Sequence, residues 1–504
     1  MVGFPPGGFL RLRPAPTGKT LGVVPQATAG LVHWLARRGV DGPLVIGYDA
    51  RHGSRAFAER AARVATGAGR PALLLPRPLP TPVLAHAVRH QRAAAGVMVT
   101  ASHNPPRDNG YKVYLGAQLG GELGDGAQIA PPVDAEIEAA IRAVGPLAEV
   151  PLGDAAATLD EEVVAAYVRG VADVVRRDGP RELTVAYTPL HGVGGAVLTA
   201  AFTQAGFPAP VVVPEQAEPD PDFPTVDFPN PEEPGAMDRV LLLAEAIDAD
   251  LAIANDPDAD RCAIAVPAPG HGWRVLRGDE LGVLLADHLM RRGATGLFAT
   301  TIVSSAMLKA LCAARGRPYA ETLTGFKWIV RAGAGQAPLA FGYEEALGYC
   351  VAPDLVRDKD GVSAALLVAE LAAELKADRR TLTDRLDELA REFGVYATDQ
   401  LAVRVDDLAE IATIMRRLRA KPPRTLLDEP VTSLEDLSPD ADVMILRTDT
   451  ARLVVRPSGT EPKLKAYLEI VEPVVDDAVA EARERAAASL MALRTETVAV
   501  LGVW

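Results

Sequence analysis

The sequence has few cysteines, no long hydrophobic run and a shortage of positive charge. Its three cysteines, Cys262, Cys312 and Cys350, lack metal-type spacing and an even disulfide framework, which favours a reducing compartment. No run approaches about 18 apolar residues, and the first residues lack the charged and apolar regions of a signal peptide. A formal net charge of −14 disfavours nucleic acid as a partner. We therefore expect a cytoplasmic enzyme without membrane or nucleic-acid partners.

What the sequence does contain fits several domains. At 504 residues it exceeds the size of a single hydrophobic core, so about three or four domains are expected. Strand and helix patterns alternate along most of its length, which indicates α/β layers with largely parallel sheets. In such sheets, ligands collect at the carboxyl ends of the strands. In the first layer we predict strands at 43–50, 71–75 and 94–101 and helices at 56–68 and 81–91.

Two further units repeat this alternation, and the rhythm changes near Phe393. The second unit includes a stretch with five prolines, 220–234, which must be an irregular surface loop. Later strands are predicted at 182–190, 209–214, 250–255 and 296–303, and later helices at 161–175, 194–206, 237–249, 304–314, 408–420 and 476–493. We expect three similar α/β domains with mixed sheets and a smaller C-terminal α+β domain, with the bounds 1–160, 161–275, 276–392 and 393–504.

The polar loop of residues 100–114 follows the strand predicted at 94–101. Ser102 lies where that strand ends, with the imidazole of His103 beside it and the ammonium of Lys112 ten residues on. A hydroxyl with such neighbours suggests a nucleophile. An ordinary turn is the alternative.

Three carboxylates stand at alternate positions in the loop after the strand predicted at 250–255. Asp256, Asp258 and Asp260 are separated only by a proline and an alanine, so a tight turn directs their oxygens towards one point. Mg²⁺ prefers such oxygen ligands, and crowded carboxylates repel one another without a cation. A metal site is therefore favoured over an acidic turn that is satisfied by solvent and helix caps.

Two other loops carry weaker signals. The run 456–460 offers a guanidinium, two hydroxyls and a glycine that suit a phosphate monoester, with Lys463 and Lys465 adding charge; a hairpin turn with a basic edge is the alternative. Glu344 and Glu345 could accept hydrogen bonds from sugar hydroxyls, or form a plain surface turn. His191 could bind phosphate at a helix start, although a structural turn histidine is favoured.

Taken in order, these loops resemble the α-D-phosphohexomutase superfamily. The motifs are Thr-Ala-Ser-His-Asn-Pro, Asp-x-Asp-x-Asp-Arg, a Glu-Glu loop and Arg-Pro-Ser-Gly-Thr, and the resemblance spans nearly the whole chain. The segments Gly-Phe-Lys-Trp-Ile and Tyr-Glu-Glu-Ala-Leu-Gly-Tyr are similar to those of the phosphoglucomutase/phosphopentomutase-like branch. The resemblance implies four domains around a central cleft, which carry in turn a phosphoserine loop, a metal loop, a sugar-binding loop and a phosphate-binding loop.

The resemblance also implies a phosphoserine mechanism with Mg²⁺ and a hexose 1,6-bisphosphate as activator and intermediate. Ser102 would carry the phosphoryl group, and the metal ligands would be Ser102, Asp256, Asp258 and Asp260. The general acid/base candidates are His103, Lys112 and Lys359. The implied substrate-binding residues are Arg261, Thr324, Gly325, Glu344, Arg456, Ser458, Gly459, Thr460 and Lys465.

The expected reaction interconverts hexose 1-phosphate and hexose 6-phosphate, with glucose or mannose as the hexose. A phosphopentomutase acting on ribose phosphates and a non-catalytic sugar-phosphate-binding protein are the alternatives, and the assembly would be a monomer or homodimer. Two departures from the family pattern stand out. The family's N-terminal Gly-Thr-x-Gly-x-Arg-Gly element is degraded at residues 7–13, where Arg11 or Arg13 could replace its arginine, and Ala346 takes the place of a frequent serine.

Overall fold

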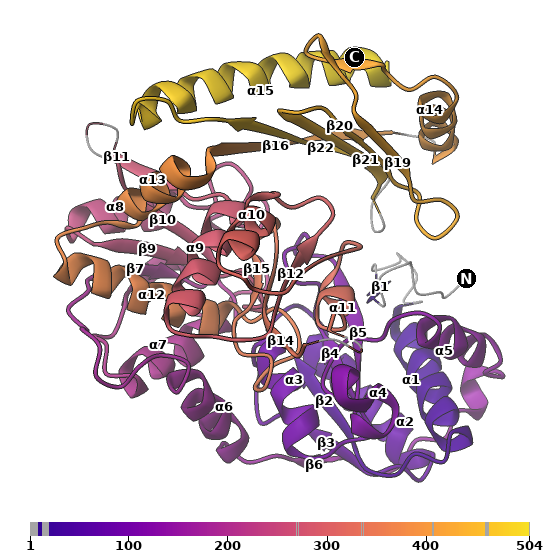
Figure 1. Ribbon diagram of the computed structural model, residues 1–504. Coiled ribbons are helices and arrows are strands. Elements are labelled where there is room, and N and C mark those ends of the chain that lie inside the picture. The colour runs from indigo at the N-terminus through magenta and orange to yellow at the C-terminus, as the bar shows by residue number, and fades with distance from the viewer. Residues whose placement is uncertain are drawn as a thin grey trace. The chain divides into compact units, whose positions relative to one another are not determined.

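The structure is a computed structural model (Figure 1). It describes residues 9–12, 20–268, 270, 272–333, 335, 337–405, 408–458 and 463–502. The chain divides into two compact units, Met1–Ala299 with Gly325–Leu382 and Thr300–Thr324 with Thr383–Trp504. None of the helices in the described ranges combines the length and the apolar character that a membrane crossing requires.

The first sheet of the first unit is mixed, in the order β1-β5-β4-β2-β3-β6. Its central strands β2 and β4 are wholly buried, as expected for parallel strands covered on both faces. Strand β5 returns antiparallel beside β4. The strands are β1 (Phe9–Leu12), β2 (Leu44–Tyr48), β3 (Ala72–Leu74), β4 (Ala95–Val99), β5 (Asn109–Leu115) and β6 (Ala157–Thr158). The helices are α1 (Thr20–Arg37), α2 (Ser54–Gly67), α3 (Thr81–His90), α4 (Ala117–Gly124) and α5 (Val133–Arg142), with a 3₁₀ turn at Leu147–Glu149.

Small apolar residues fit these helices to the sheet. In α2, Ala58, Ala61, Ala62 and Ala65 recur at helical spacing and are buried in the same core as the strands. This periodicity is the signal that predicted the helix from the sequence.

The second sheet, also in the first unit, has the order β11-β10-β9-β7-β8. Strands β7, β8 and β9 run parallel, and β10 returns antiparallel beside β9. The strands are β7 (Val185–Thr188), β8 (Val211–Val212), β9 (Leu251–Ala254), β10 (Ala263–Ala268) and β11 (Gly272–Val275). The helices are α6 (Glu162–Ala172), α7 (Gly194–Gln204) and α8 (Asp238–Ala246), with a 3₁₀ turn at Pro214–Gln216. As predicted, the proline-rich residues 220–234 form neither helix nor strand.

The third sheet repeats the pattern, with β12 parallel to β14 and β15 returning antiparallel. In the first unit lie β14 (Leu339–Glu344), β15 (Gly348–Cys350), α9 (Gly278–Arg291), α11 (Phe326–Ile329) and α12 (Gly361–Ala377). Strand β12 (Leu297–Thr301) runs into the second unit, where β13 (Tyr319–Thr322) and α10 (Met307–Ala314) follow.

The three sheets share one strand arrangement, namely β2-β4-β5, β7-β9-β10 and β12-β14-β15. In each, a parallel strand is followed by an antiparallel neighbour, and the polar loop predicted to carry chemistry connects the two. The expectation of three similar α/β units with mixed sheets is therefore confirmed.

The C-terminal part of the second unit is an antiparallel sheet in the order β16-β22-β21-β20-β19, and α15 runs along β16 and β22 (Figure 1). Ala482, Ala486 and Leu493 of α15 are buried at helical spacing. This is the predicted smaller α+β domain. Its strands are β16 (Val395–Arg404), β17 (Thr425–Leu426), β18 (Glu429–Pro430), β19 (Ser433–Asp436), β20 (Met444–Arg447), β21 (Ala451–Pro457) and β22 (Lys463–Glu472), and its helices are α13 (Leu382–Phe393), α14 (Leu408–Ala420) and α15 (Val479–Leu501).

The sequence reasoning missed several elements. The loop expected up to Tyr114 ends at Asn109, where β5 begins, so Lys112 lies on a strand. Helices α1 and α5 were not predicted, and α15 extends to Leu501 instead of ending at 493. Strand β5 is buried along its whole length, although the polar residues at its start do not indicate a buried strand.

Candidate active site

Ser102 lies in the connection between β4 and β5, with 8% of its surface exposed. Its backbone has a left-handed φ of 50°, which is costly for a residue other than glycine. The Oγ donates a hydrogen bond to Asp256 Oδ2 at 2.7 Å and lies 3.3 Å from His103 Nδ1. The loop thus directs the hydroxyl towards the acidic loop of the second sheet.

Asp256, Asp258 and Asp260 lie in the connection between β9 and β10, and all three are fully buried. One carboxylate oxygen from each lies within 4.8 Å of the others. The Oδ1 atoms of Asp258 and Asp260 are buried without a hydrogen-bond partner, an arrangement that costs free energy unless a cation or donor satisfies them. These oxygen donors fit Mg²⁺.

Two ammonium groups face the same carboxylates. Lys112 Nζ lies 2.8 Å from Asp258 Oδ2 and 2.9 Å from Asp260 Oδ2, and Lys359 Nζ lies 3.3 Å from Asp260 Oδ2. Burial alone would lower the pKa of Lys112, but Asp258 and Asp260 raise it above its ordinary value. The pKa of Lys359 is raised in the same way, against burial, chiefly by Asp260. Both side chains therefore remain cationic.

The pKa values of two of these carboxylates are shifted in opposite directions. Burial, followed by the charges of Asp258 and Asp260, raises the pKa of Asp256 well above its ordinary value. Burial would also raise the pKa of Asp258, but Lys112 and a hydrogen bond from Thr81 Oγ1 at 2.6 Å lower it. The site thus holds one carboxyl that takes up a proton readily and one that stays ionised.

His103 is held neutral. Burial lowers the pKa of His103 well below its ordinary value, and the positive charge of Arg261 acts in the same direction. A neutral imidazole 3.3 Å from the Ser102 hydroxyl can accept a proton.

Arg261 and Glu344 border the acidic loop. The backbone N–H of Arg261 donates to Asp256 Oδ1 at 3.1 Å, and its guanidinium lies 3.1 Å from Glu232 Oε2. Glu344 ends β14, and burial raises its pKa to about 7 despite Lys359 and Arg261. A side chain at Gly348 would displace the side chains of Lys359 and Glu344, because its Cβ would lie 2.4 Å from Lys359 Cδ and 2.9 Å from Glu344 Oε1.

The structure brings Ser102, His103, Lys112, the three aspartates, Arg261, Glu344 and Lys359 together in the first unit. Gly325, whose φ is 111°, precedes α11 in the same unit. Thr324 belongs to the second unit.

The predicted phosphate loop is the connection between β21 and β22 in the second unit. Arg456 lies opposite Lys465 across this strand pair, and the backbone N–H of Ser458 donates to the carbonyl of Lys463 at 2.7 Å. The strand pair thus places two basic residues, Arg456 and Lys465, at one register position. Gly459 and Thr460 lie outside the described residues, as does Arg13, while the backbone of Arg11 pairs with Gly110 in the first sheet.

Other singled-out residues have structural surroundings. His191 Nε2 lies 2.8 Å from Thr225 Oγ1, and burial lowers the pKa of this histidine, which fits the structural turn that the sequence favoured. All three cysteines are free and buried, and burial raises the pKa of the Cys312 thiol to about 12.

Besides Thr81, sequence reasoning missed Asp49 and Arg51, which follow β2 beside the site. Asp49 accepts a hydrogen bond from Thr100 Oγ1 at 2.6 Å, and Arg51 donates to backbone carbonyls of the Ser102 loop. One signal could have found them, because β2 and β4 are adjacent parallel strands and their carboxyl ends meet at one edge.

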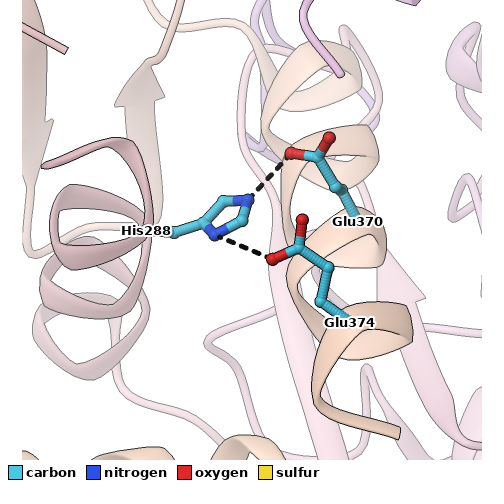
Figure 2. A group of neighbouring side chains, drawn as sticks. All are labelled: His288, Glu370 and Glu374. Carbon is cyan, nitrogen blue, oxygen red and sulfur yellow. Dashed lines mark hydrogen bonds and ion pairs between the residues drawn. The ribbon is translucent and has the colours of Figure 1, made fainter. Parts of the chain in front are cut away.

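A second group of metal-type ligands lies between α9 and α12, where His288 faces Glu370 and Glu374 (Figure 2). His288 Nε2 lies 2.8 Å from Glu370 Oε2, and Nδ1 lies 3.8 Å from Glu374 Oε2. Glu370 also accepts a hydrogen bond from Arg292 at 2.6 Å. The imidazole lies between the two carboxylates, so these three residues form a polar contact between the two helices.

Comparison with known proteins matches all four parts of the chain. Family models described as phosphoglucomutase/phosphomannomutase, alpha/beta/alpha domains I, II and III, and the C-terminal domain, match residues 14–146, 165–270, 277–393 and 401–488.

Curated relatives match over most of their length. "Probable phosphomannomutase" of Haemophilus influenzae is 44% identical over 89% of this chain and 92% of its own. Phosphopentomutase of Mus musculus is 34% identical (89% and 80%), and phosphoglucomutase of Staphylococcus epidermidis is 32% identical (89% and 86%). The solved structure of a "putative phosphomannomutase" from Thermus thermophilus shares the fold, with a TM-score of 0.76 at 24% identity over 97% of this chain and 99% of that chain.

The fold and these matches define a phosphomutase, an isomerase that acts as an intramolecular phosphotransferase. The chain belongs to the phosphoglucomutase/phosphomannomutase family, within the α-D-phosphohexomutase superfamily that the motifs predicted.

Proposed function

We propose that the protein interconverts hexose 1-phosphate and hexose 6-phosphate through a phosphorylated Ser102 and a hexose 1,6-bisphosphate. The observation that carries this proposal is the 2.7 Å hydrogen bond from Ser102 Oγ to Asp256, in a buried group of three carboxylates with unpaired oxygens. A hydroxyl held there suits phosphoryl transfer. We also propose the domain bounds 1–160, 161–275, 276–392 and 393–504, a cytoplasmic location and a monomer or homodimer.

Ser102, Asp256, Asp258 and Asp260 would hold Mg²⁺, which when bound supplies charge stabilisation at a transferring phosphoryl group. In the first transfer, the bond from phosphorus to Ser102 Oγ breaks, and a bond forms from phosphorus to a hydroxyl of the sugar monophosphate. The proton of that hydroxyl passes to a base, for which the neutral His103 imidazole is suited. The return transfer reverses these steps with the other phosphoryl group.

The cationic side chains would have a different role. Lys112 and Lys359 stay protonated because of their carboxylate partners, so they can stabilise developing negative charge or donate a proton, while Arg261 adds a further positive charge. Glu344 would accept hydrogen bonds from sugar hydroxyls. The residues proposed to bind the remaining substrate groups, including its non-reacting phosphate, are Thr324, Gly325, Arg456, Ser458, Gly459, Thr460 and Lys465.

A phosphopentomutase is the second candidate, because relatives with that name match 89% of this chain at 34% identity. Ala346 favours neither sugar, since it removes a hydroxyl without adding a contact. Coupled assays with glucose 1-phosphate, mannose 1-phosphate and ribose 1-phosphate, with Mg²⁺ and a bisphosphate activator, separate the candidates. Absence of turnover with all three would refute both.

The covalent step has its own test. Intact-mass measurement of the purified protein should show one added phosphate that Ser102→Ala lacks, and this variant should lose its activity while its circular dichroism spectrum is unchanged. Full activity of that variant would exclude Ser102 as the phosphoryl carrier.

A further inference from the structure

The side chain of Arg51 is almost completely enclosed by the loop that carries Ser102. It is 4% exposed, and its guanidinium donates hydrogen bonds to the backbone carbonyls of Ser102, Asn104, Pro105 and Asp108. The bonds to Asn104, Pro105 and Asp108 measure 2.6, 2.8 and 3.3 Å. One planar group with several fixed donors thus holds four carbonyls of a single loop.

Asp49 holds Arg51 from the strand side. Asp49 Oδ2 lies 3.3 Å from Arg51 Nε, and Asp49 also accepts hydrogen bonds from the hydroxyls of Ser54 and Thr100. Thr100 Oγ1 in turn accepts the backbone N–H of Ser102 at 2.9 Å. The charge pair therefore connects the ends of β2 and β4 to the residue with the left-handed backbone.

The ring of Phe223 covers the guanidinium of Arg51. Phe223 is 2% exposed, and the Arg51 guanidinium carbon lies 4.9 Å from its ring centroid, a cation–π geometry that gains strength when water is excluded. Phe223 belongs to the proline-rich loop 220–234, which has no role in the reaction proposed above. The same loop supplies Glu232, whose carboxylate pairs with Arg261 beside the acidic loop.

We propose that Arg51 is a positioning residue for Ser102 and that Phe223 holds Arg51 in place, so that the proline-rich loop 220–234 supports the phosphoryl-transfer loop. This inference rests on the proposed function of Ser102. Its consequence is kinetic: loss of the Phe223 contact leaves substrate binding intact and lowers the fraction of enzyme in which Ser102 Oγ points at Asp256. The turnover number falls and KM changes little.

The decisive variant is Phe223→Leu, which keeps an apolar side chain and removes the aromatic face. Its matched control is Phe207→Leu, because Phe207 is also buried and carries Arg181 over its ring at 4.6 Å, in a contact outside the proposed site. We expect Phe223→Leu to lower kcat by about threefold to thirtyfold with KM within about twofold, and Phe207→Leu to leave both unchanged. Unchanged kcat in Phe223→Leu, or an equal loss in both variants, would overturn the proposal.

Arg51→Lys keeps the charge opposite Asp49 but cannot reach four carbonyls, and we expect a loss in kcat of about a hundredfold. If this variant fails to fold, Phe223→Leu still decides. Hydrogen exchange of a peptide spanning residues 102–108 gives a readout independent of activity: exchange should rise in Phe223→Leu and not in Phe207→Leu. Unchanged exchange there would contradict the inference.

The two proposals fail in different ways. If Ser102→Ala retains activity, the phosphoserine function is wrong, and the hydrogen-exchange comparison alone decides whether Phe223 supports the loop. If Ser102→Ala is inactive while Phe223→Leu matches the wild type in kcat and exchange, the function stands and the positioning role is refuted.

Discussion

Two groups of metal-type ligands lie among the described residues of the first unit, and their charges are balanced differently. Asp256, Asp258 and Asp260 carry three carboxylates opposite two ammonium groups, those of Lys112 and Lys359. A phosphoryl group on the adjacent Ser102 would add further negative charge. The negative charge of this group therefore exceeds the positive charge of its two ammonium partners, and a divalent cation could neutralise the excess.

The group between α9 and α12 is balanced by the protein itself. Glu370 is paired with Arg292, and Glu374 Oε1 lies 3.8 Å from a guanidinium nitrogen of Arg176. His288 donates to Glu370, and its Nδ1 is the atom of this group that lacks a hydrogen bond. Burial would raise the pKa of Glu370, but the hydrogen bonds from His288 and the Arg176 backbone, with the charge of Arg292, lower it. Charge balance, more than ligand type, therefore distinguishes a group that could hold a cation from a polar contact between helices.

The largest effect is expected where the acidic group loses a ligand. Asp258→Asn keeps the shape but removes a charge that Lys112 and the proposed metal would share, so activity should fall by at least about a thousandfold in a coupled mutase assay. EDTA should abolish wild-type activity, and Mg²⁺ should restore it. The control is Glu374→Gln, which should keep its activity per folded molecule. Comparable losses in both variants would erase the distinction between the two groups.

Substitution in the group of His288, Glu370 and Glu374 should lower the stability of the fold and leave activity unchanged. Glu370→Gln leaves Arg292 without its buried partner, and we expect a loss of about 3 kcal/mol in the free energy of unfolding, measured by urea denaturation, with normal kcat. Glu59→Gln, at an exposed pair with Arg55, should change stability by less than about 0.5 kcal/mol. Because the folded pKa of Glu370 is lowered, its contribution is full above the ordinary value and is lost as pH falls through the folded pKa. A pH-independent difference between Glu370→Gln and the wild type would contradict this assignment.

A smaller effect should appear in metal binding. Because the pKa of Asp256 is raised in the metal-free site, a proton competes with Mg²⁺, and the dissociation constant for Mg²⁺ should rise by up to about tenfold per unit as pH falls below that pKa. Isothermal titration between pH 8 and pH 5 measures this change, together with proton release on binding. Constant affinity over the range would mean that Asp256 is already ionised before the metal binds.

The sequence predicted the fold class and the position of the polar loops after β4, β9 and β14, because both depend on local signals. Apolar periodicity located α2 and α14, and loops such as the one after β9 follow buried strands directly. The residues around Lys112 were misread because β5 is buried within a polar-looking sequence. Arg51 and Thr81 were missed for another reason: their partners, backbone carbonyls near Ser102 and the carboxylate of Asp258, are far away in the sequence and meet them only in the folded chain.

The left-handed backbone of Ser102 also limits which residue could take its place. Threonine offers the same hydroxyl, but its branched β-carbon is poorly tolerated at a φ of 50°. Serine combines an oxygen nucleophile with a side chain small enough for this conformation. The choice of amino acid at this position is therefore imposed by the shape of the turn as much as by the chemistry of the hydroxyl.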